Sequence, residues 1–368
     1  KVTICAQKVS YKSELLFMRY TVYFLFICCI SFISAQNLSL DAAQDLFDNS
    51  KYSEIDSYVR VSPKSIEKDP DLLVSYFEEI AETDLEKARA IYVWLAENIS
   101  YDAKAINKNK FGDNSALGVL KSRKAVCQGY AKLFELLGKK MGLNIQFVSG
   151  YSKNDVQEES WDFDDEEGGH AWNMIKIGDD WRVFDATWGA GSGNFDARGR
   201  LVFIKEYTDN WFNLSPYEAI FSHYPEDTSL LLTEPRPSLD KFESLQLIPI
   251  YSFTSNLLDA KSTFIKALKK PSAKFPKIYP VEPSEFQVIR APKEFRLRKR
   301  KPHYFEFLAK GVVDIFLYLD NENTETFLKE EGENHYSLQF TTREELDIKI
   351  VVETIDGDLF AILEYTTR

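Results

Sequence analysis

Two neighbouring segments in the first third of the chain have apolar residues at helical spacing. The first opens at Pro70 and carries its apolar residues on one stripe: Leu72, Leu73, Tyr76, Phe77 and Ile80. The second opens with Thr83 and Glu86, a capping-box pair in which each side chain satisfies a backbone N–H at a helix start. Its apolar residues follow at the same spacing: Leu85, Ala88, Tyr92, Leu95 and Ile99. We predict two helices that each pack one face into a core, after a polar lead-in at residues 36–69 with one short helix near Leu40–Phe47.

A third helical pattern begins at Cys127. Its apolar residues recur at helical spacing until Gly138 and Gly142 mark the end: Tyr130, Leu133, Phe134 and Leu137. Cys127 is therefore expected in the first turn, where unpaired amides and the helix dipole stabilise negative charge and favour a thiolate over a thiol. Three basic residues before it either act in the same direction or form a solvated loop: Lys121, Arg123 and Lys124.

Residues 143–188 carry shorter apolar runs that are typical of β-strands. We predict strands at Ile145–Gly150, His170–Ile177 and Trp181–Trp188. The glycine-rich stretch 189–193 lacks the lysine and the strand-to-helix setting of a phosphate-binding loop, so we interpret it as a flexible turn.

The turn between the last two of these strands decides whether His170 and Asp185 can meet. A two-residue turn pairs Ile177 with Asp180 and makes Asp185 a diagonal neighbour of His170 on the same face of the sheet. A shift of one residue would place the two side chains on opposite faces. The spacing therefore permits a contact between imidazole and carboxylate.

Short alternating runs dominate the last part of the chain. A domain boundary is marked by three prolines, Pro225, Pro235 and Pro237. The segment after it has one predicted helix, at Leu258–Leu268. The later runs predict strands at Phe286–Ile289, Tyr304–Leu308, Val312–Leu319, Tyr336–Phe340, Leu346–Val352 and Leu359–Tyr365. We predict a mixed helix and sheet domain over residues 70–235, a connecting segment over 236–283 and an immunoglobulin-like β-sandwich over 284–368.

Composition and charge narrow the classes of function. The chain has 368 residues, of which 44% are hydrophobic, so it can bury the cores of about two domains. Its formal net charge of −12 and pI near 5.1 argue against a nucleic-acid-binding protein, because such proteins neutralise phosphates with a basic surface. The basic stretch 296–301 is interpreted as strand and turn surface, with a polyanion or cell-surface contact as the alternative.

The first 35 residues have the pattern of upstream residues followed by a secretory signal peptide. Met18 is a candidate start, Arg19 supplies positive charge, and the apolar run Tyr20–Ile33 precedes a small residue at Ala35. An uncleaved membrane anchor is the alternative, but the run is shorter than the roughly 20 residues that span a bilayer. We therefore expect cleavage after Ala35 and an extracytoplasmic location: secreted, periplasmic or on the cell surface.

Cleavage would leave a single cysteine. Cys5, Cys28 and Cys29 precede the cleavage position, so Cys127 would remain and no disulfide could form within the mature chain. A lone cysteine is often a small buried hydrophobic residue. The helix start argues instead for a reactive thiol.

A thiol enzyme needs a base near the sulfur and a third group that orients the base. His170 is predicted on a strand beside the strand that carries Asp185, so Cys127, His170 and Asp185 are the candidate catalytic residues. Two histidines of the predicted sandwich are interpreted as structural: His303 and His335.

Short stretches around the three candidates support this choice together. They read VCQGYA at 126–131, GHAWN at 169–173 and FDATW at 184–188, in the order Cys, His, Asp. These stretches resemble the transglutaminase-like superfamily, and most of all its kyphoscoliosis-peptidase-like branch. The later stretch DNWFNLSP at 209–216, followed by HYP at 223–225, resembles the segment that closes the domain in that branch.

The resemblance covers about residues 70–230 and implies an α+β fold. The core would be papain-like, with helices packed on an antiparallel sheet, and the all-β sandwich would follow it. Cys127 would attack a peptide or carboxamide carbonyl, His170 would protonate the leaving amine, and Asp185 would hold His170. His223 would be structural, and no cofactor or metal is expected.

The leading hypothesis is an exported enzyme that cleaves or transfers at such bonds through a thioester, with water or an amine as acceptor. The alternative is a non-catalytic binding or scaffold protein that keeps the fold. The expected partner is a protein or peptide substrate. The acidic residues between Ser152 and Gly169 could attract substrates that carry amine groups. The alternative is that these residues form only a solvated loop. Cell-surface or cell-wall association is a further option, and nucleic acid is not expected.

Overall fold

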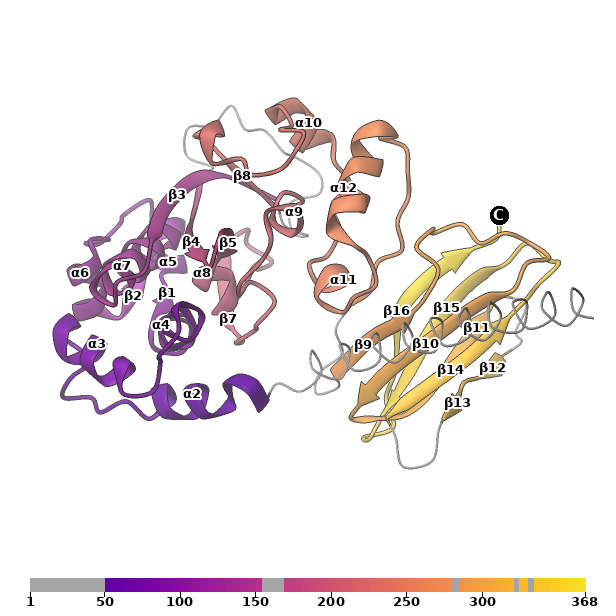
Figure 1. Cartoon of the computed structure of the whole chain (residues 1–368), viewed down its shortest axis with the longest axis horizontal. Coiled ribbons are helices and arrows are strands. Elements are labelled where there is room, and N and C mark those ends of the chain that lie inside the picture. The colour runs from indigo at the N-terminus through magenta and orange to yellow at the C-terminus, as the bar shows by residue number, and fades with distance from the viewer. Residues whose placement is uncertain (1–49, 154–168, 280–284, 321–323, 330–333) are drawn as a thin grey trace, which may run out of the picture. The chain divides into compact units, whose positions relative to one another are not determined.

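The structure is a computed structural model that describes residues 50–153, 169–279, 285–320, 324–329 and 334–368 (Figure 1). The signal peptide and the helix predicted near Leu40–Phe47 lie outside these ranges. The described helices before the first large sheet are α2 (Ser50–Arg60), α3 (Pro70–Glu78), α4 (Asp84–Asn98), α5 (Ala103–Lys108), α6 (Ala116–Ser122) and α7 (Cys127–Lys140). Of these, α3, α4 and α7 begin where the sequence predicts them.

Helix α4 is more deeply buried than its pattern predicts. Its capping box forms, because Thr83 Oγ1 accepts from the Glu86 N–H while the Glu86 carboxylate accepts from the Thr83 N–H at 2.8 Å. Every residue from Ala88 to Ala96 is buried, so α4 is a core helix and the prediction of one packed face was too narrow. Helix α2, which the sequence did not predict, packs on α4, and so do α3 and α7, so more than one face of α4 is covered.

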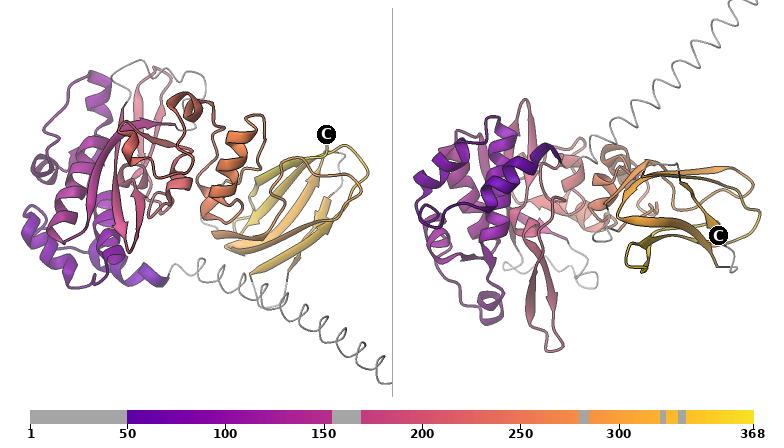
Figure 2. Two further views of the ribbon diagram at one scale, coloured as in Figure 1. Left: turned by 45° about the horizontal axis from the view of Figure 1, so that its top comes forward. Right: turned by 90° about the horizontal axis from the view of Figure 1, so that it is seen from below.

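The sheet beside these helices has the strand order β5-β4-β3-β8 and is antiparallel. Its strands are β3 (Ile145–Ser152), β4 (His170–Ile177), β5 (Asp180–Phe184) and β8 (His223–Pro225). Helix α7 packs on β3 and β4, and Figure 2 shows the helices of the N-terminal half on one side of the sheet. This arrangement confirms the predicted α+β core.

The predicted two-residue turn is correct, but the strand after it is shorter than predicted. Ile177 pairs with Asp180, and the ladder of β4 and β5 ends where Asn173 pairs with Phe184. The prediction of a strand up to Trp188 was wrong, because Asp185 caps the short helix α8 (Ala186–Gly189) and turns the chain out of the sheet. The glycine-rich stretch is not a flexible turn either: it enters strand β6 (Gly191–Phe195), which pairs with β7 (Leu201–Lys205).

The second half of the described chain continues from short helices into two four-stranded antiparallel sheets. The helical elements are α9 (Pro216–Ala219), η2 (Thr228–Leu230), α10 (Leu239–Ser244), α11 (Tyr251–Thr254) and α12 (Ala260–Lys269). The sheet strands are β9 (Glu285–Arg290), β10 (His303–Lys310), β11 (Val312–Leu319), β12 (Thr324–Thr326), β13 (Leu328–Lys329), β14 (His335–Phe340), β15 (Asp347–Thr354) and β16 (Leu359–Thr366). All six predicted strands of this region are present.

The two sheets have the orders β13-β14-β10-β9 and β12-β11-β15-β16. Inward side chains of both sheets share one hydrophobic core with residues of the connecting segment, such as Phe242 and Phe264. The connecting segment therefore packs with the sandwich instead of acting as a free linker.

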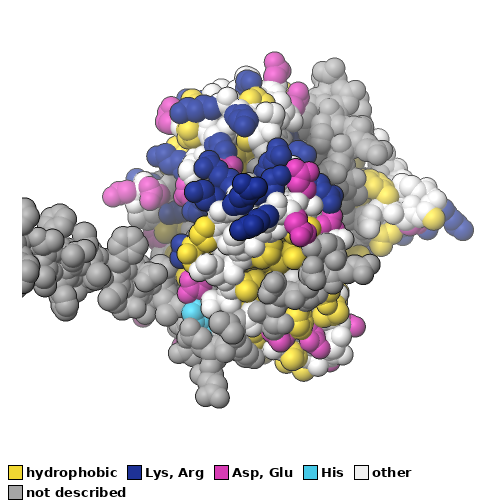
Figure 3. All heavy atoms as spheres, turned by 90° about the vertical axis from the view of Figure 1, so that its right-hand side faces the viewer, with side chains coloured by type: hydrophobic (Ala, Val, Ile, Leu, Met, Phe, Trp, Pro, Cys, Tyr) yellow, Lys and Arg dark blue, Asp and Glu magenta, His cyan; other side chains and the backbone are white. Residues whose placement is uncertain are grey.

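The segment between β9 and β10 carries the basic stretch predicted to lie at the surface. Arg296, Arg298, Lys299, Arg300 and Lys301 are exposed, and Figure 3 shows lysine and arginine side chains gathered on one face of the molecule. Across the described residues, we find no helix with the length and apolar content that a membrane span requires.

Candidate active site

Cys127 is the first residue of α7, as the sequence predicts. The short parallel pair of β1 (Ser100–Tyr101) and β2 (Lys124–Ala125) fixes the chain just before it, and the Asp102 N–H donates to the Ala125 carbonyl at 2.9 Å. The Cys127 side chain is partly exposed. A thiol at this position is therefore accessible to a ligand and lies at the positive end of the helix dipole.

A glycine lets α7 start this close to its neighbours. A Cβ on Gly129 would lie 2.7 Å from the Ala125 Cβ and 2.8 Å from Val119 Cγ2, which is too close for either contact. Any larger side chain at this position would push the first turn of α7, and Cys127 with it, out of place.

The basic residues before Cys127 do not gather around its sulfur. Arg123 pairs with Glu67 at 3.1 Å and lies 4.6 Å from the Trp94 ring centroid. Lys121 and Lys124 are exposed. Of the two predicted roles for this run, the solvated surface fits Lys121 and Lys124, whereas Arg123 has a structural role.

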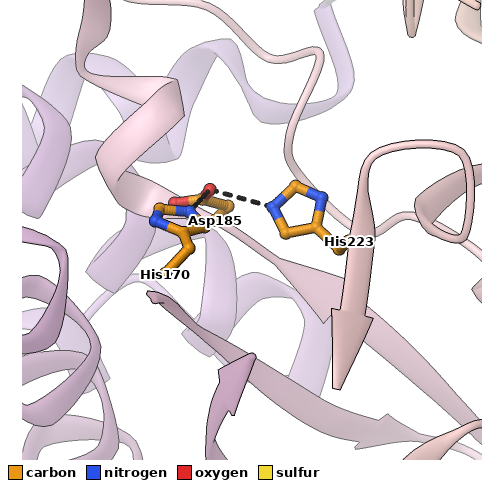
Figure 4. Close-up of side chains that lie close together, drawn as sticks. All are labelled: His170, Asp185 and His223. Carbon is orange, nitrogen blue, oxygen red and sulfur yellow. Dashed lines mark hydrogen bonds and ion pairs between the residues drawn. The ribbon is translucent and has the colours of Figure 1, made fainter. Parts of the chain in front are cut away.

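His170 and Asp185 meet inside the molecule (Figure 4). His170 Nε2 lies 2.7 Å from Asp185 Oδ2, and the two residues are 8% and 0% exposed. The other carboxylate oxygen accepts from the backbone N–H groups of Thr187 at 2.9 Å and Trp188 at 3.1 Å. Asp185 thus reaches His170 as a helix cap and not as the strand neighbour that the sequence predicts.

The same contacts decide the charges of the pair. Burial disfavours a charged His170, but the Asp185 carboxylate and the Cys127 sulfur, which also hydrogen-bonds His170, raise the pKa of His170 to about 10. Burial works against ionised Asp185 as well, yet His170 and His223 hold the pKa of Asp185 well below its usual range. At neutral pH the pair is therefore an imidazolium and a carboxylate.

Tryptophan rings enclose His170. Its ring stacks on Trp188 with centroids 5.0 Å apart and on Trp172 at 5.9 Å, with interplanar angles of 25° and 30°. The indole faces exclude water, and their negative face favours an adjacent cation. Nothing in the sequence pattern predicted this role, although Trp172 and Trp188 lie in the two short stretches that contain His170 and Asp185.

His223 lies closer to the site than its predicted structural role requires. Its Nε2 is 3.2 Å from Asp185 Oδ2, so two imidazoles share one carboxylate oxygen. Strand β8 places it there by pairing His223 with Ser152 of β3. A strand of three residues has too few positions for an alternating pattern, so the sequence carries no signal for this contact.

Three side chains here could also serve as metal ligands by type. His170, Asp185 and His223 offer donor atoms that all lie within 4.8 Å of one another, and two imidazoles with a carboxylate are a set that zinc accepts. Each facing nitrogen already shares a hydrogen with the carboxylate, so a metal would displace both hydrogen bonds. The arrangement suits a base and its orienting group better.

The remaining histidines have partners within the sandwich. His303 Nε2 lies 2.9 Å from the Arg298 carbonyl, and His335 Nε2 lies 2.9 Å from Glu306. The acidic residues between Ser152 and Gly169 all lie outside the described ranges. Lys153, which belongs to the same stretch, is buried and donates to backbone carbonyls of α10 and the residues after it.

The family model of the transglutaminase-like superfamily matches residues 73–186. The match includes Cys127, His170 and Asp185 and ends one residue into α8. The closing segment with His223 lies beyond it.

Curated relatives agree with this match. The human kyphoscoliosis peptidase is 32% identical over 212 residues, which cover 57% of this chain and 30% of the human protein. The Lim and transglutaminase domain protein ltd-1 of Caenorhabditis elegans is 30% identical over 190 residues, covering 48% of this chain and 25% of that protein. The chain thus spans less than a third of the length of either relative.

Among solved structures, a putative cysteine protease from Cytophaga hutchinsonii is similar, with 22% identity and a TM-score of 0.25. The likeness covers 42% of this chain and 46% of that one. The family match rests on the sequence model and on the curated relatives, and it confirms the resemblance seen in the three short stretches. Residues 73–186 thus match the transglutaminase-like superfamily, and the chain is similar to proteins of the kyphoscoliosis peptidase group.

Proposed function

We propose that the chain is a thiol enzyme that acts on peptide or carboxamide bonds through a thioester on Cys127. The observation that carries the proposal is the buried ion pair of His170 and Asp185, in which His170 also interacts with Cys127 at the start of α7. A thiol nucleophile, a base and an orienting carboxylate are the three parts that such chemistry needs.

The first step forms the thioester. The Cys127 sulfur attacks the carbonyl carbon, and the C–N bond breaks as His170 gives its proton to the leaving nitrogen. Because His170 Nε2 faces Asp185, Nδ1 is the atom that faces Cys127 and carries this proton. Asp185 stays ionised and holds the ring in this tautomer.

The second step releases the acyl group. Water or a primary amine attacks the thioester carbon, His170 takes the proton of the attacking atom, and the C–S bond breaks to restore the Cys127 thiolate. Water gives hydrolysis and an amine gives transfer. A protein or peptide substrate fits either outcome.

Developing negative charge on the carbonyl oxygen needs donors. The Cys127 N–H is a natural one, because it belongs to the first helical residue and has no backbone acceptor within the described part of the chain. In the proposed reaction it would point at the oxyanion with the helix dipole behind it.

Export from the cytoplasm is part of the same proposal. It rests on the apolar run Tyr20–Ile33 and on the small residue Ala35, both outside the described residues. The relatives named above give no support for it. Mass spectrometry of the secreted and cell-bound protein would decide, since the proposal requires a mature N-terminus after Ala35.

The proposed reaction can be tested by profiling peptide and glutamine-amide substrates with and without a primary amine. Ammonia or a new N-terminus is released when the thioester forms, so it reports acylation of Cys127 in either case. A free carboxylate on the acyl product then supports hydrolysis, and incorporation of the amine supports transfer. Cys127→Ala should abolish either product. If the wild-type protein forms neither product and Cys127 reacts with electrophiles no faster than a free thiol, the protein is a binding or scaffold module that keeps the fold.

A further inference from the structure

His223 is a buried titratable residue beside the proposed base, and the chemistry above leaves it unused. Its Nε2 approaches the Asp185 oxygen that already accepts from His170, at 3.2 Å and 2.7 Å respectively (Figure 4). The second oxygen accepts from two backbone N–H groups of α8. A carboxylate has about four acceptor sites, so His223 completes the set of donors around Asp185.

We propose that His223 is a positioning residue of the active site, whose neutral imidazole donates Nε2–H to Asp185 and fixes the direction in which this carboxylate faces His170. The role rests on the function proposed above, because His223 would act on His170 only through Asp185. It touches no reacting atom.

Ser222 determines which nitrogen of His223 carries the hydrogen. An ionised carboxylate only accepts, so Nε2 must be the protonated nitrogen. The other nitrogen, Nδ1, lies 2.8 Å from Ser222 Oγ, and a neutral ring needs a donor there. The Ser222 hydroxyl is that donor, although its oxygen also lies 3.2 Å from the Ala219 carbonyl.

The surroundings keep His223 neutral. It is 2% exposed and packs against three indole rings, with centroids 4.6 Å from Trp188, 4.9 Å from Trp172 and 5.5 Å from Trp211. Burial lowers the pKa of His223 below its ordinary value, even though Asp185 acts in the opposite direction. A second cation beside the His170 imidazolium is thereby avoided.

Loss of His223 would leave an acceptor site of Asp185 facing the indoles. Water is excluded there, so the carboxylate would turn toward its remaining donors and hold His170 less well. The backbone cap of α8 does not depend on His223. A positioning role therefore predicts a change in thiol reactivity without loss of the fold.

The first test measures alkylation of Cys127 by iodoacetamide at pH 6 in the purified full chain. His223→Leu should slow the reaction about tenfold, the effect of one lost hydrogen bond to a buried charge. His223→Gln should restore most of the rate, because its amide nitrogen can reach the same oxygen. His303→Gln is the matched control and should react as the wild type does. Equal rates for wild type and His223→Leu, or equal losses in the Leu and Gln variants when both unfold at the wild-type temperature, would overturn the proposal.

The second test reads the tautomer directly and does not depend on activity. The chain has 4 histidines, so ¹⁵N-histidine labelling of the Cys127→Ala variant gives few signals. We expect His223 to have a protonated Nε2 and a bare Nδ1 from pH 6 to 8, and Ser222→Ala to weaken this preference. A protonated Nδ1 with a bare Nε2 would refute the role. If the thiol of the wild type reacts slowly but the expected tautomer is present, the proposed function fails and the hydrogen bond of His223 stands.

Discussion

The carboxylate of Asp185 holds the imidazole of His170 with one oxygen and starts helix α8 with the other. Because one buried side chain does both, its charge and its shape can be tested separately. Asp185→Asn keeps an oxygen for the cap but removes the charge, and its amide can present a donor to His170. We expect turnover to fall by about 10²- to 10⁴-fold, as for other triads that lose this charge. Steady-state kinetics at pH 7 would measure the loss.

Asp185→Ala removes the cap as well. We expect it to lower the free energy of unfolding by roughly 2–4 kcal/mol, since the cap is lost and His170 is left without its counter-charge. Urea unfolding would measure this value. If the Asn and Ala variants have the same stability, the cap contributes nothing and the local account of α8 is wrong.

The pKa of His170 predicts how the stability of the fold depends on pH. This pKa is raised from 6.5 to about 10, so the native state binds the proton more tightly than the unfolded state does. The resulting stabilisation is complete below about pH 6.5 and is lost as the pH rises toward 10. On the acid side, Asp185 has a lowered pKa, and its contribution is lost as the pH falls below about 4.

Urea titrations of the wild type and of His170→Gln at pH 5, 7, 9 and 10.5 would test this. The difference in unfolding free energy between them should shrink between pH 7 and 10.5. A difference that is constant over this range would mean that His170 is not charged in the folded protein.

A buried ion pair ties the unpredicted helix α2 to the core helix α4. Arg89, which is 4% exposed, donates to both oxygens of Asp56 at 2.8 Å and 2.6 Å and pairs with Asp209 at 2.8 Å. Arg89→Leu would leave the buried Asp56 carboxylate without its guanidinium partner. We therefore expect the free energy of unfolding to fall by about 3–5 kcal/mol.

Arg200→Leu on the β6–β7 hairpin is the matched control for this pair. Arg200 also pairs with a carboxylate, Asp196, but its side chain is 60% exposed. The control should cost at most ~1 kcal/mol. Similar losses for both variants in thermal or urea unfolding would contradict the assigned role of Arg89.

Lys153, directly after β3, links this strand to helix α10 by hydrogen bonds. Its Nζ donates to the carbonyls of Phe242, Glu243 and Leu245, and burial lowers the pKa of Lys153 to about 8. Lys153→Met keeps the apolar stem but leaves these carbonyls without a donor, so we expect a loss of about 2–3 kcal/mol. The exposed Lys124→Met should stay within ~0.5 kcal/mol of the wild type. A silent Lys153→Met variant would show that water replaces the ammonium group.

The parts of the fold that the sequence predicted are those set by local rules. The capping box at Thr83, the helix start at Cys127 and the turn between Ile177 and Asp180 depend on a few neighbouring residues. The alternating strands of the sandwich follow in the same way. Each of these signals lies within one element, so no knowledge of the tertiary structure was needed.

What the sequence missed depends on contacts between distant segments. Helix α2 has few apolar residues, and the ion pair of Asp56 with Arg89 joins positions 33 residues apart. The strand predicted at Trp181–Trp188 included Asp185, yet the carboxylate of Asp185 caps α8 instead. The approach of His223 to Asp185 spans 38 residues and has no local pattern at all.

The double duty of Asp185 has a consequence for comparing relatives of this chain. A relative that has given up catalysis but kept the architecture still needs an acceptor to begin the helix after β5, so an aspartate there reports on folding as much as on chemistry. The Cys127 side chain is partly exposed and does not cap α7, so the fold depends on it less. The residue aligned with Cys127 is therefore the better marker for sorting working enzymes from inert copies.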